Sequence, residues 1–213
     1  MTDLAAPSAH KVNDTMAATA LIVAGGALGG FVLGIAARAW MRLISDDPGF
    51  SWSGTLFIIG GFTVFGLTQS IVAVTRRRTR RCGPLTIART VGIIGMLPLF
   101  FAAGAVMLPT VVAGGLAVVR VDWTRAIRWI FVLFASVPVI FVGRDLIDTF
   151  GWSLHATAGV VAMLGVYGVI IWATRFTFTA PPAAWRLPTW AKITIIVALA
   201  LLVLRTTVGA GIQ

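Results

Sequence analysis

The feature that most constrains this chain is a series of apolar stretches, each about as long as a bilayer is thick. A transmembrane helix needs about 20 predominantly apolar residues, and several stretches here reach that length. Hydrophobic residues make up 58% of the chain and charged residues only 11%, whereas a soluble domain carries about 25% charged residues. Lipid must therefore be the solvent for most of the chain. We expect an all-α, polytopic transmembrane helical bundle.

Hydropathy predicts six major spans. They cover residues 16–37, 53–74, 90–119, 126–143, 151–174 and 190–208. The third differs from the others because its thirty uncharged residues are interrupted by Pro98, Pro109 and the Gly114–Gly115 pair. At 1.5 Å per residue it would form about 45 Å of helix, which is long for one crossing and short for two. It could thus include a re-entrant segment or a short seventh span.

An arginine run predicts the orientation. The run is the densest charge in the chain and consists of Arg76, Arg77, Arg78, Arg80 and Arg81. By the positive-inside rule it anchors the cytoplasmic side, so the N-terminus is cytoplasmic and the loop over residues 38–52 is outside. Residues 1–15 are expected to be a disordered cytoplasmic tail rather than a cleaved signal peptide.

Charge counting favours the re-entrant or double crossing over a single one. A single crossing of residues 90–119 divides the basic residues almost evenly across the membrane. If residues 90–119 instead return to the side from which they started, a second group of basic residues lies on the cytoplasmic side. This group is Arg120, Arg125, Arg128, Arg175, Arg186 and Lys192. Only Arg38, Arg42 and Arg144 then stay outside, which agrees better with the positive-inside rule.

Glycines in the first span recur at four-residue spacing on two adjacent stripes. They are Gly25, Gly26, Gly29, Gly30 and Gly34. Small residues at this spacing let a second helix approach closely, which matters because lipid gives helices no hydrophobic reason to pair. The face could pack against another helix of this chain or against a partner protein. Packing within the chain is the simpler interpretation.

Polar residues at the predicted outer interface form a second candidate site. The set is Arg38, Arg42, Asp46, Asp47, Arg144, Asp145, Asp148 and His155. These charges can neutralise one another as loop ion pairs. His155 is the only histidine in a predicted span, so haem with two histidine ligands is not expected.

The two halves of the chain resemble one another at several points. Phe50-Ser-Trp52-Ser matches Phe150-Gly-Trp152-Ser about one hundred residues later, and each follows an arginine and a pair of aspartates. This pattern predicts a 3+3 internal repeat. The units would be residues 16–108 and 126–213, joined by a linker over 109–125. The alternative is that interfacial aromatic and arginine residues resemble one another by composition alone.

Catalytic patterns are missing from the sequence. It contains no HExxH, no GxSxG, no phosphate-binding glycine loop and no glutamate at all, although hydrolytic chemistry needs such acids, bases or nucleophiles. One cysteine excludes a cysteine metal cluster or an internal disulfide. We expect no enzyme activity and no cofactor. The net charge of +10 lies at helix ends, where it favours anionic lipid headgroups over nucleic acid.

One segment resembles a known group of proteins. Arg38-Ala-Trp40-Met-Arg42-Leu-Ile-Ser, continued by Phe50-Ser-Trp52-Ser-Gly-Thr-Leu-Phe, looks like uncharacterised small integral membrane proteins of actinobacteria. Mycobacterial envelope complexes, such as the Mce lipid importers, include small helical accessory proteins of this type. The resemblance implies a plasma-membrane accessory subunit, with lipid transport as a candidate process.

The sequence therefore predicts a non-enzymatic accessory or scaffold subunit of a larger bacterial plasma-membrane complex. Its expected partners are the lipid bilayer and other membrane protein subunits. The alternative is a small duplicated transporter or lipid-binding membrane protein.

Overall fold

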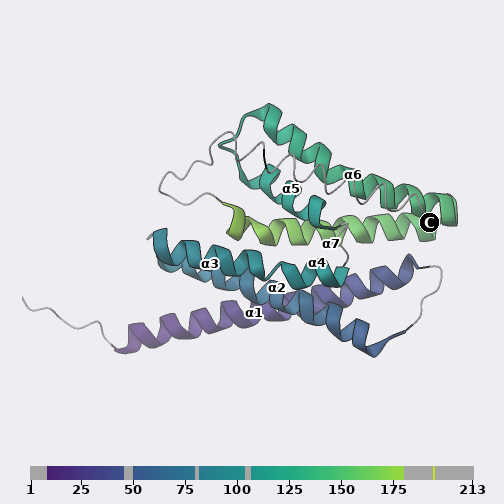
Figure 1. The fold of residues 1–213 in the computed structure, drawn as a ribbon. Helices are drawn as coiled ribbons and strands as arrows, with labels where there is room; N and C mark the ends of the chain where they lie inside the picture. Colours follow the sequence, from purple (N-terminus) through teal and green to yellow (C-terminus); the bar gives the residue numbers. More distant parts are fainter. Residues whose placement is uncertain (1–8, 46–49, 80–81, 104–106, 180–193, 195–213) are drawn as a thin grey trace, which may run out of the picture.

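Helices make up almost all of the structure that can be described. The computed structural model describes residues 9–45, 50–79, 82–103, 107–179 and 194, and these include helices but no strand. The helices in this part of the chain are α1 (Ala9–Leu43), α2 (Trp52–Arg78), α3 (Cys82–Ile94), α4 (Leu97–Ala103), α5 (Met107–Val119), α6 (Arg125–Phe150) and α7 (Leu154–Phe178). They form an elongated bundle (Figure 1). The predicted all-α class is confirmed.

Five helical stretches are long and apolar enough to cross a membrane. They are Met16–Leu43, Trp52–Arg78, Gly83–Phe101, Arg125–Phe150 and Leu154–Phe178, and α5 is a shorter apolar helix. Large apolar side chains such as Leu21, Phe101 and Leu133 are exposed on the outside of the bundle. An exposed apolar exterior of this extent is incompatible with water and suits lipid. The fold is therefore compatible with a multi-pass membrane protein.

Proline explains why the third apolar stretch is broken. A proline ring clashes with the carbonyl four residues earlier and cannot donate a backbone hydrogen bond. Helix α3 ends at Ile94, four residues before Pro98, and Pro98 then occupies the first turn of α4, where proline is well tolerated.

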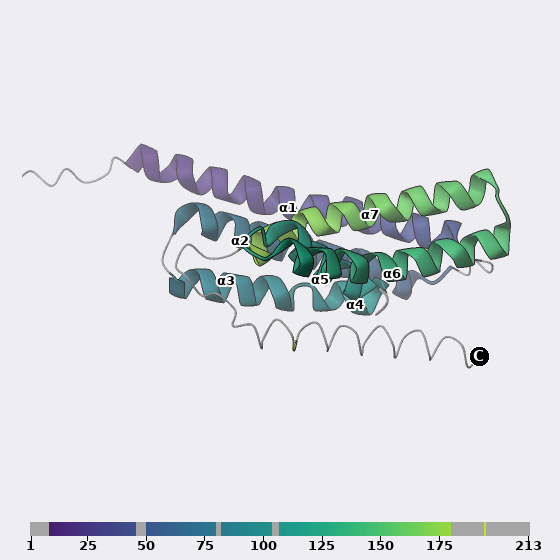
Figure 2. The ribbon, with the colours of Figure 1, turned by 90° about the horizontal axis from the view of Figure 1, so that it is seen from above.

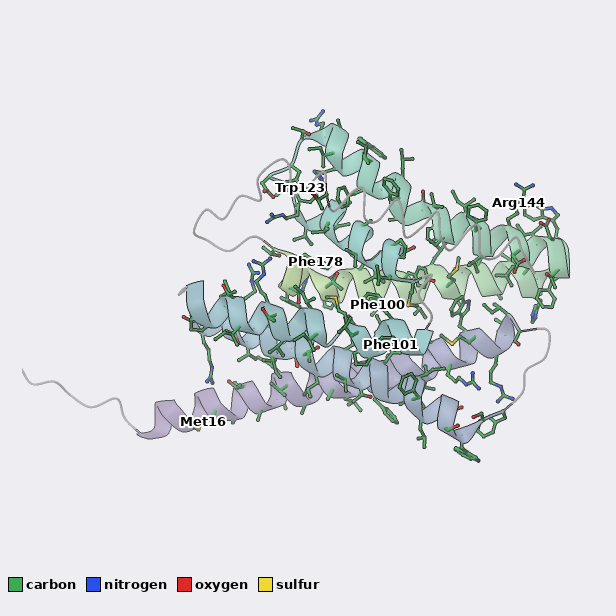
Figure 3. The ribbon with its side chains drawn as sticks, viewed as in Figure 1. Met16, Phe100, Phe101, Trp123, Arg144 and Phe178 are labelled. Atoms are coloured by element: carbon green, nitrogen blue, oxygen red, sulfur yellow. The ribbon has the colours of Figure 1, made fainter. Side chains whose placement is uncertain are left out.

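The short helix α5 returns toward the end of the bundle from which α3 started. Figure 1 shows α5 between α6 and α7, and α5 contacts both helices. Figure 3 places Met16 and Trp123 toward one end of the bundle and Arg144 at the other. This is the path predicted for a re-entrant segment, while the number of bilayer crossings stays a prediction.

Glycines bring the backbones of α1 and α2 into direct contact. A Cβ added to Gly30 would lie 2.3 Å from the Phe62 carbonyl oxygen, and one added to Gly66 would lie 2.2 Å from the Gly26 carbonyl oxygen. No side chain fits in such spaces. The predicted close approach of helices is thus made within the chain.

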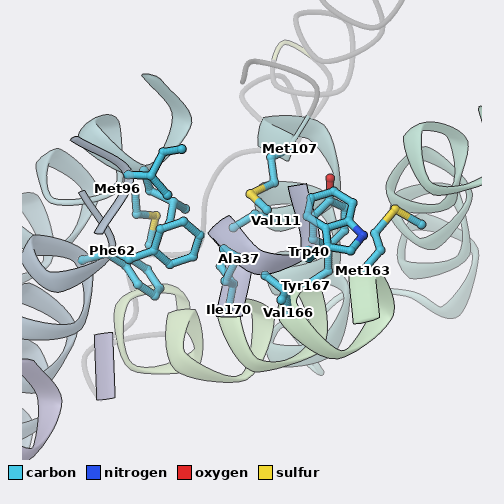
Figure 4. Close-up of a cluster of buried hydrophobic side chains, with 13 residues drawn as sticks. Ala37, Trp40, Phe62, Met96, Met107, Val111, Met163, Val166, Tyr167 and Ile170 are labelled. Carbon is cyan, nitrogen blue, oxygen red and sulfur yellow. The ribbon is translucent and has the colours of Figure 1, made fainter. Parts of the chain in front are cut away.

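The main core lies where α7 meets α1, α2 and α5. Its largest members include Trp40, Phe62, Met107 and Met163 (Figure 4). The Trp40 Nε1–H donates to the Gly159 carbonyl at 2.9 Å, so a buried indole links α1 to α7. Viewed from above, α7 runs beside α1 across the bundle (Figure 2). A smaller core joins α5 and α6 around Trp123 and Phe131.

Several helix boundaries differ from the sequence prediction. Helix α1 begins at Ala9, so the predicted disordered tail is helical over residues 9–15, and residues 1–8 lie outside the described part. It continues to Leu43, which places Arg38 and Arg42 on a helix rather than in a loop. Helices α2, α6 and α7 likewise continue past the predicted ends of their spans. The predicted span over 190–208 lies outside the described residues except for Thr194, which is helical.

The predicted linker is also mostly helix, since α5 covers it up to Val119. Helices α2 and α7, which would correspond in the predicted repeat, have similar cap residues. Ser51 caps α2 and Ser153 caps α7, and the C-caps Thr79 and Thr179 are one hundred residues apart. The serines are 102 residues apart, however, so the two starts are offset from the sequence match by two residues. The third helix of the second unit lies outside the described residues, and the 3+3 repeat stays a prediction.

Candidate functional site

An apolar groove lies between α1, α2 and α7 and is the main candidate site. Its volume is about 280 Å³, and apolar groups form most of its wall. The lining residues include Gly25, Gly29, Phe65, Gln69, Arg77 and Trp172. Because α1 contributes one wall and is otherwise packed mainly against α2, the groove opens at the edge of the bundle.

The two glycine stripes of α1 have different roles. Gly26, Gly30 and Gly34 face α2, where an added Cβ would meet atoms closer than 3.0 Å. Gly25 and Gly29 line the groove, as Gly26 and Gly30 also do, but an added Cβ at Gly25 or Gly29 would meet nothing within 4 Å. Only the second stripe therefore leaves room for another molecule.

Polar groups on the inner wall of the groove are largely satisfied within the protein. The buried Gln69 amide donates to the Gly92 carbonyl at 3.2 Å, and its oxygen accepts from the Thr177 hydroxyl at 2.7 Å. This connection joins α2, α3 and α7. Sequence reasoning did not single out Gln69, although a glutamine within an apolar span is a recognisable signal.

The predicted outer-interface residues do not form one site in the described structure. The Arg38 Nε–H donates to the Thr55 hydroxyl at 3.2 Å, and the Arg42 guanidinium lies 5.3 Å from the Phe50 ring centroid. Both arginines therefore pair α1 with the start of α2. Asp46 and Asp47 lie outside the described residues.

The remaining outer residues lie around the turn between α6 and α7. The Arg144 Nε and Asp148 Oδ2 atoms are 4.0 Å apart, and both side chains are largely exposed. Asp145 and His155 are also exposed, and the centroids of the His155 and Phe150 rings are 4.7 Å apart with the rings tilted by 57°. Exposed pairs of this kind contribute little energy.

The predicted cytoplasmic arginines serve several different contacts. Arg76 donates to the Phe176 and Thr179 carbonyls at 3.0 Å, Arg77 lines the groove, and Arg78 donates to the Thr19 hydroxyl. Arg80 and Arg81 lie outside the described residues.

Two further arginines at this end were missed as site residues. The Arg89 Nε–H donates to the Thr177 carbonyl at 2.8 Å, so Arg76 and Arg89 together cap the C-terminus of α7. Arg120, just after α5, is only 4% exposed, and its Nε lies 3.7 Å from the Asp122 carboxylate. In the sequence Arg89 lies alone near the start of an apolar stretch, which could have marked it for attention.

The fold and the groove define a class: an all-α bundle of apolar helices, compatible with a multi-pass membrane protein. The chain matches no protein-family model, no curated protein and no solved structure.

Proposed function

We propose that this chain is a non-enzymatic accessory or scaffold subunit of a larger bacterial plasma-membrane complex. In this proposal the groove receives a transmembrane helix of a partner subunit. The observation that carries it is the open space above Gly25 and Gly29, on a helix that lies at the edge of the bundle.

The chemistry of association in lipid supports a helix as the occupant. Lipid tails are as apolar as the helix surface, so helices associate through close van der Waals contact, and small residues allow that contact. On α1 the glycine face toward α2 is already used, whereas the face with Gly25 and Gly29 is not. Exposed Leu21 and Leu28 lie on the same helix and offer further apolar contact.

The proposal of a role without catalysis is based on the sequence, which contains none of the common catalytic patterns named above. Within the described residues, no three His, Cys, Asp or Glu side chains are close enough together to hold a metal ion. The exposed Asp145, Asp148 and His155 lie near the turn between α6 and α7 rather than in the groove. The resemblance to small actinobacterial membrane proteins extends the proposal to an envelope complex engaged in lipid transport.

The proposal is tested by filling the groove. Gly29→Leu places a bulky side chain in the open space and should abolish co-purification of partner subunits after mild detergent extraction. Gly165→Leu is the matched control, because Gly165 is also exposed on a helix with nothing near its added Cβ but does not line the groove. Native mass spectrometry of both variants and the wild type measures which partner subunits remain bound.

A wild-type protein that is a stable monomer or homodimer without partners would contradict the proposal. Loss of partners from both leucine variants would contradict the assignment of the groove as the binding face.

The alternative function, a lipid-binding protein or small duplicated transporter, is favoured by one feature of the same groove. Arg77 lines it together with apolar residues, and the nearby Trp172 stacks under Arg175 at 4.0 Å. An acyl chain in the groove with its headgroup at Arg77 would use this arrangement. Arg77→Gln would then reduce co-purified anionic lipid, whereas a partner helix would be retained.

A further inference from the structure

A second pocket lies beside the start of α6, and we call it the α6 pocket. Its volume is about 320 Å³, and its lining is Ala117 of α5 with Arg125, Arg128, Trp129 and Val132 of α6. Among the described residues that line it, two are arginines and none is acidic. The α6 pocket shares no residue with the groove between α1, α2 and α7, so it is a separate site.

The two arginines of the α6 pocket are placed on one side of the helix. Arg125 is exposed and lies three residues before Arg128, a spacing that puts two side chains next to each other on a helix surface. Arg128 is half-buried, and its Nε–H donates to the Ala117 carbonyl at 3.0 Å. This bond fixes the guanidinium at the pocket wall and uses one of its five N–H donors. The other donors can serve a ligand in the pocket.

The stability of α6 itself does not explain why arginines occupy its first turn. The N-terminal end of a helix carries partial positive charge and favours acidic residues over basic ones. The first turn of α6 contains no acidic residue, and the Thr124 side chain makes no cap hydrogen bond. The acid closest in sequence is Asp122, which lies 3.7 Å from the Arg120 Nε and does not line the pocket. An anion in the α6 pocket would offset this charge.

The α6 pocket also lies where bilayer headgroups are expected. Arg125 is the first residue of a helix that is long and apolar enough to cross a membrane. The exposed Trp129 follows it within about one turn, and an indole prefers the boundary between lipid and water. Figure 3 shows Trp123, just before α6, toward one end of the bundle and Arg144 at the other. The pocket is therefore at the end of a candidate span rather than at its middle.

We propose that the α6 pocket binds the phosphate headgroup of an anionic phospholipid. Guanidinium groups present planar pairs of N–H donors that match phosphate oxygens, and two of them line this pocket. Ala117 and Val132 lie beside the arginines and provide an apolar surface for the first part of an acyl chain. Basic pockets of this kind at the ends of transmembrane helices recognise anionic headgroups. The bound lipid would contact both α5 and α6.

Native mass spectrometry of the purified full-length protein tests the proposal, with phosphatidylglycerol or phosphatidylcholine of the same chain length. The wild type should retain phosphatidylglycerol about tenfold better than phosphatidylcholine. Arg125→Gln should remove most of this preference, and because Arg125 is exposed, the variant is expected to fold. Adding Arg128→Gln should remove the rest.

Arg144→Gln is the matched control. It removes the same charge from an exposed residue of the same helix, at the other end of the bundle (Figure 3). The preference should be unchanged in this variant if the α6 pocket is the binding site. A preference that came only from the net charge of the protein would fall equally in Arg125→Gln and Arg144→Gln.

A free phosphate species would use the same arginine chemistry, so thermal unfolding is also measured in phosphate and in chloride at equal ionic strength. Stabilisation by inorganic phosphate that Arg125→Gln removes, without a preference between the two lipids, would overturn the lipid as the ligand. The proposal is also overturned if the wild type retains both lipids equally and phosphate does not stabilise it, if Arg125→Gln keeps the full preference, or if Arg144→Gln lowers it as much as Arg125→Gln.

Discussion

Helices α1 and α2 form one hairpin of the bundle, and helices α6 and α7 form another. In the first, backbones meet through Gly26, Gly30 and Gly66, and a Cβ at any of these positions would meet backbone atoms at 2.9 Å or less. In the second, α6 contacts α7 less than it contacts α5, which lies between them.

The difference shows two ways to close a helical hairpin in an apolar protein. Glycines on both helices remove side chains from the contact, so α1 and α2 need no third element between them. The second hairpin is filled by α5, whose small residues Ala113 and Ala117 pack with Phe131 of α6. The inserted helix also brings its C-terminal half against the end of α7, where a Cβ added to Gly115 would lie 2.8 Å from the Phe178 ring.

The largest expected effect comes from widening the first hairpin. Gly30→Ala should destabilise the protein by about 3 kcal/mol, because the new methyl group would lie 2.3 Å from a backbone oxygen of α2 that cannot move alone. Unfolding in mixed detergent micelles measures the change. Gly29→Ala, one residue earlier and facing open space, is the control and should stay within about 0.5 kcal/mol of the wild type. Equal effects would show that α1 is rotated from the orientation described.

The same substitution in the second hairpin should cost less. At Gly114 of α5 an added Cβ would lie 2.8 Å from the Cδ1 atom of Ile171, which is the flexible end of a side chain and can turn away. We expect Gly114→Ala to cost about 1 kcal/mol in the same unfolding measurement. A cost as large as that of Gly30→Ala would remove the distinction between the two hairpins.

A single hydrogen bond offers a smaller test of how α5 is held. The buried Thr110 hydroxyl donates to the Ala135 carbonyl of α6 at 2.9 Å, so Thr110→Val should cost about 1 kcal/mol or slightly less. Thr90→Val serves for comparison, because the exposed Thr90 hydroxyl only donates to Thr86 in its own helix. If the two variants lose the same free energy of unfolding, the Thr110 hydrogen bond does not stabilise the packing of α5 against α6.

The smallest effect is expected at the turn between α6 and α7. Arg144 and Asp148 are exposed and 4.0 Å apart, so Arg144→Gln should change stability by less than about 0.5 kcal/mol. A clear decrease in the midpoint of thermal unfolding would mean that this ion pair stabilises the second hairpin more than its exposure and distance indicate.

Much of the fold follows from local sequence. Apolar length predicts the long helices, and Pro98 marks the break between α3 and α4. The glycine spacing predicts a close helix contact, but it cannot tell which stripe faces α2, because Gly25 and Gly26 are chemically identical and differ only in direction. Tertiary packing alone makes that choice.

The candidate sites depend even more on long-range packing. The arginine run is obvious in the sequence, yet its members make separate contacts, and Arg76 meets carbonyls one hundred residues away. Arg89 is isolated in sequence, and only packing brings it to the end of α7, where its Nε–H donates to the Thr177 carbonyl. Conversely, Arg38 and Arg144 are parts of one predicted cluster but make separate contacts, one to Thr55 and the other to Asp148.

The central claim is that α5 returns to the end of the bundle where α2 finishes, and cysteine accessibility tests it most directly. In a Cys82→Ser background, Thr79→Cys, Val121→Cys and Trp152→Cys are each labelled with a membrane-impermeant maleimide in membrane vesicles of known orientation. Val121 and Trp152 are well exposed and Thr79 partly so. The account predicts that positions 79 and 121 are labelled from one side and position 152 from the other. Labelling of position 121 together with position 152 would contradict it.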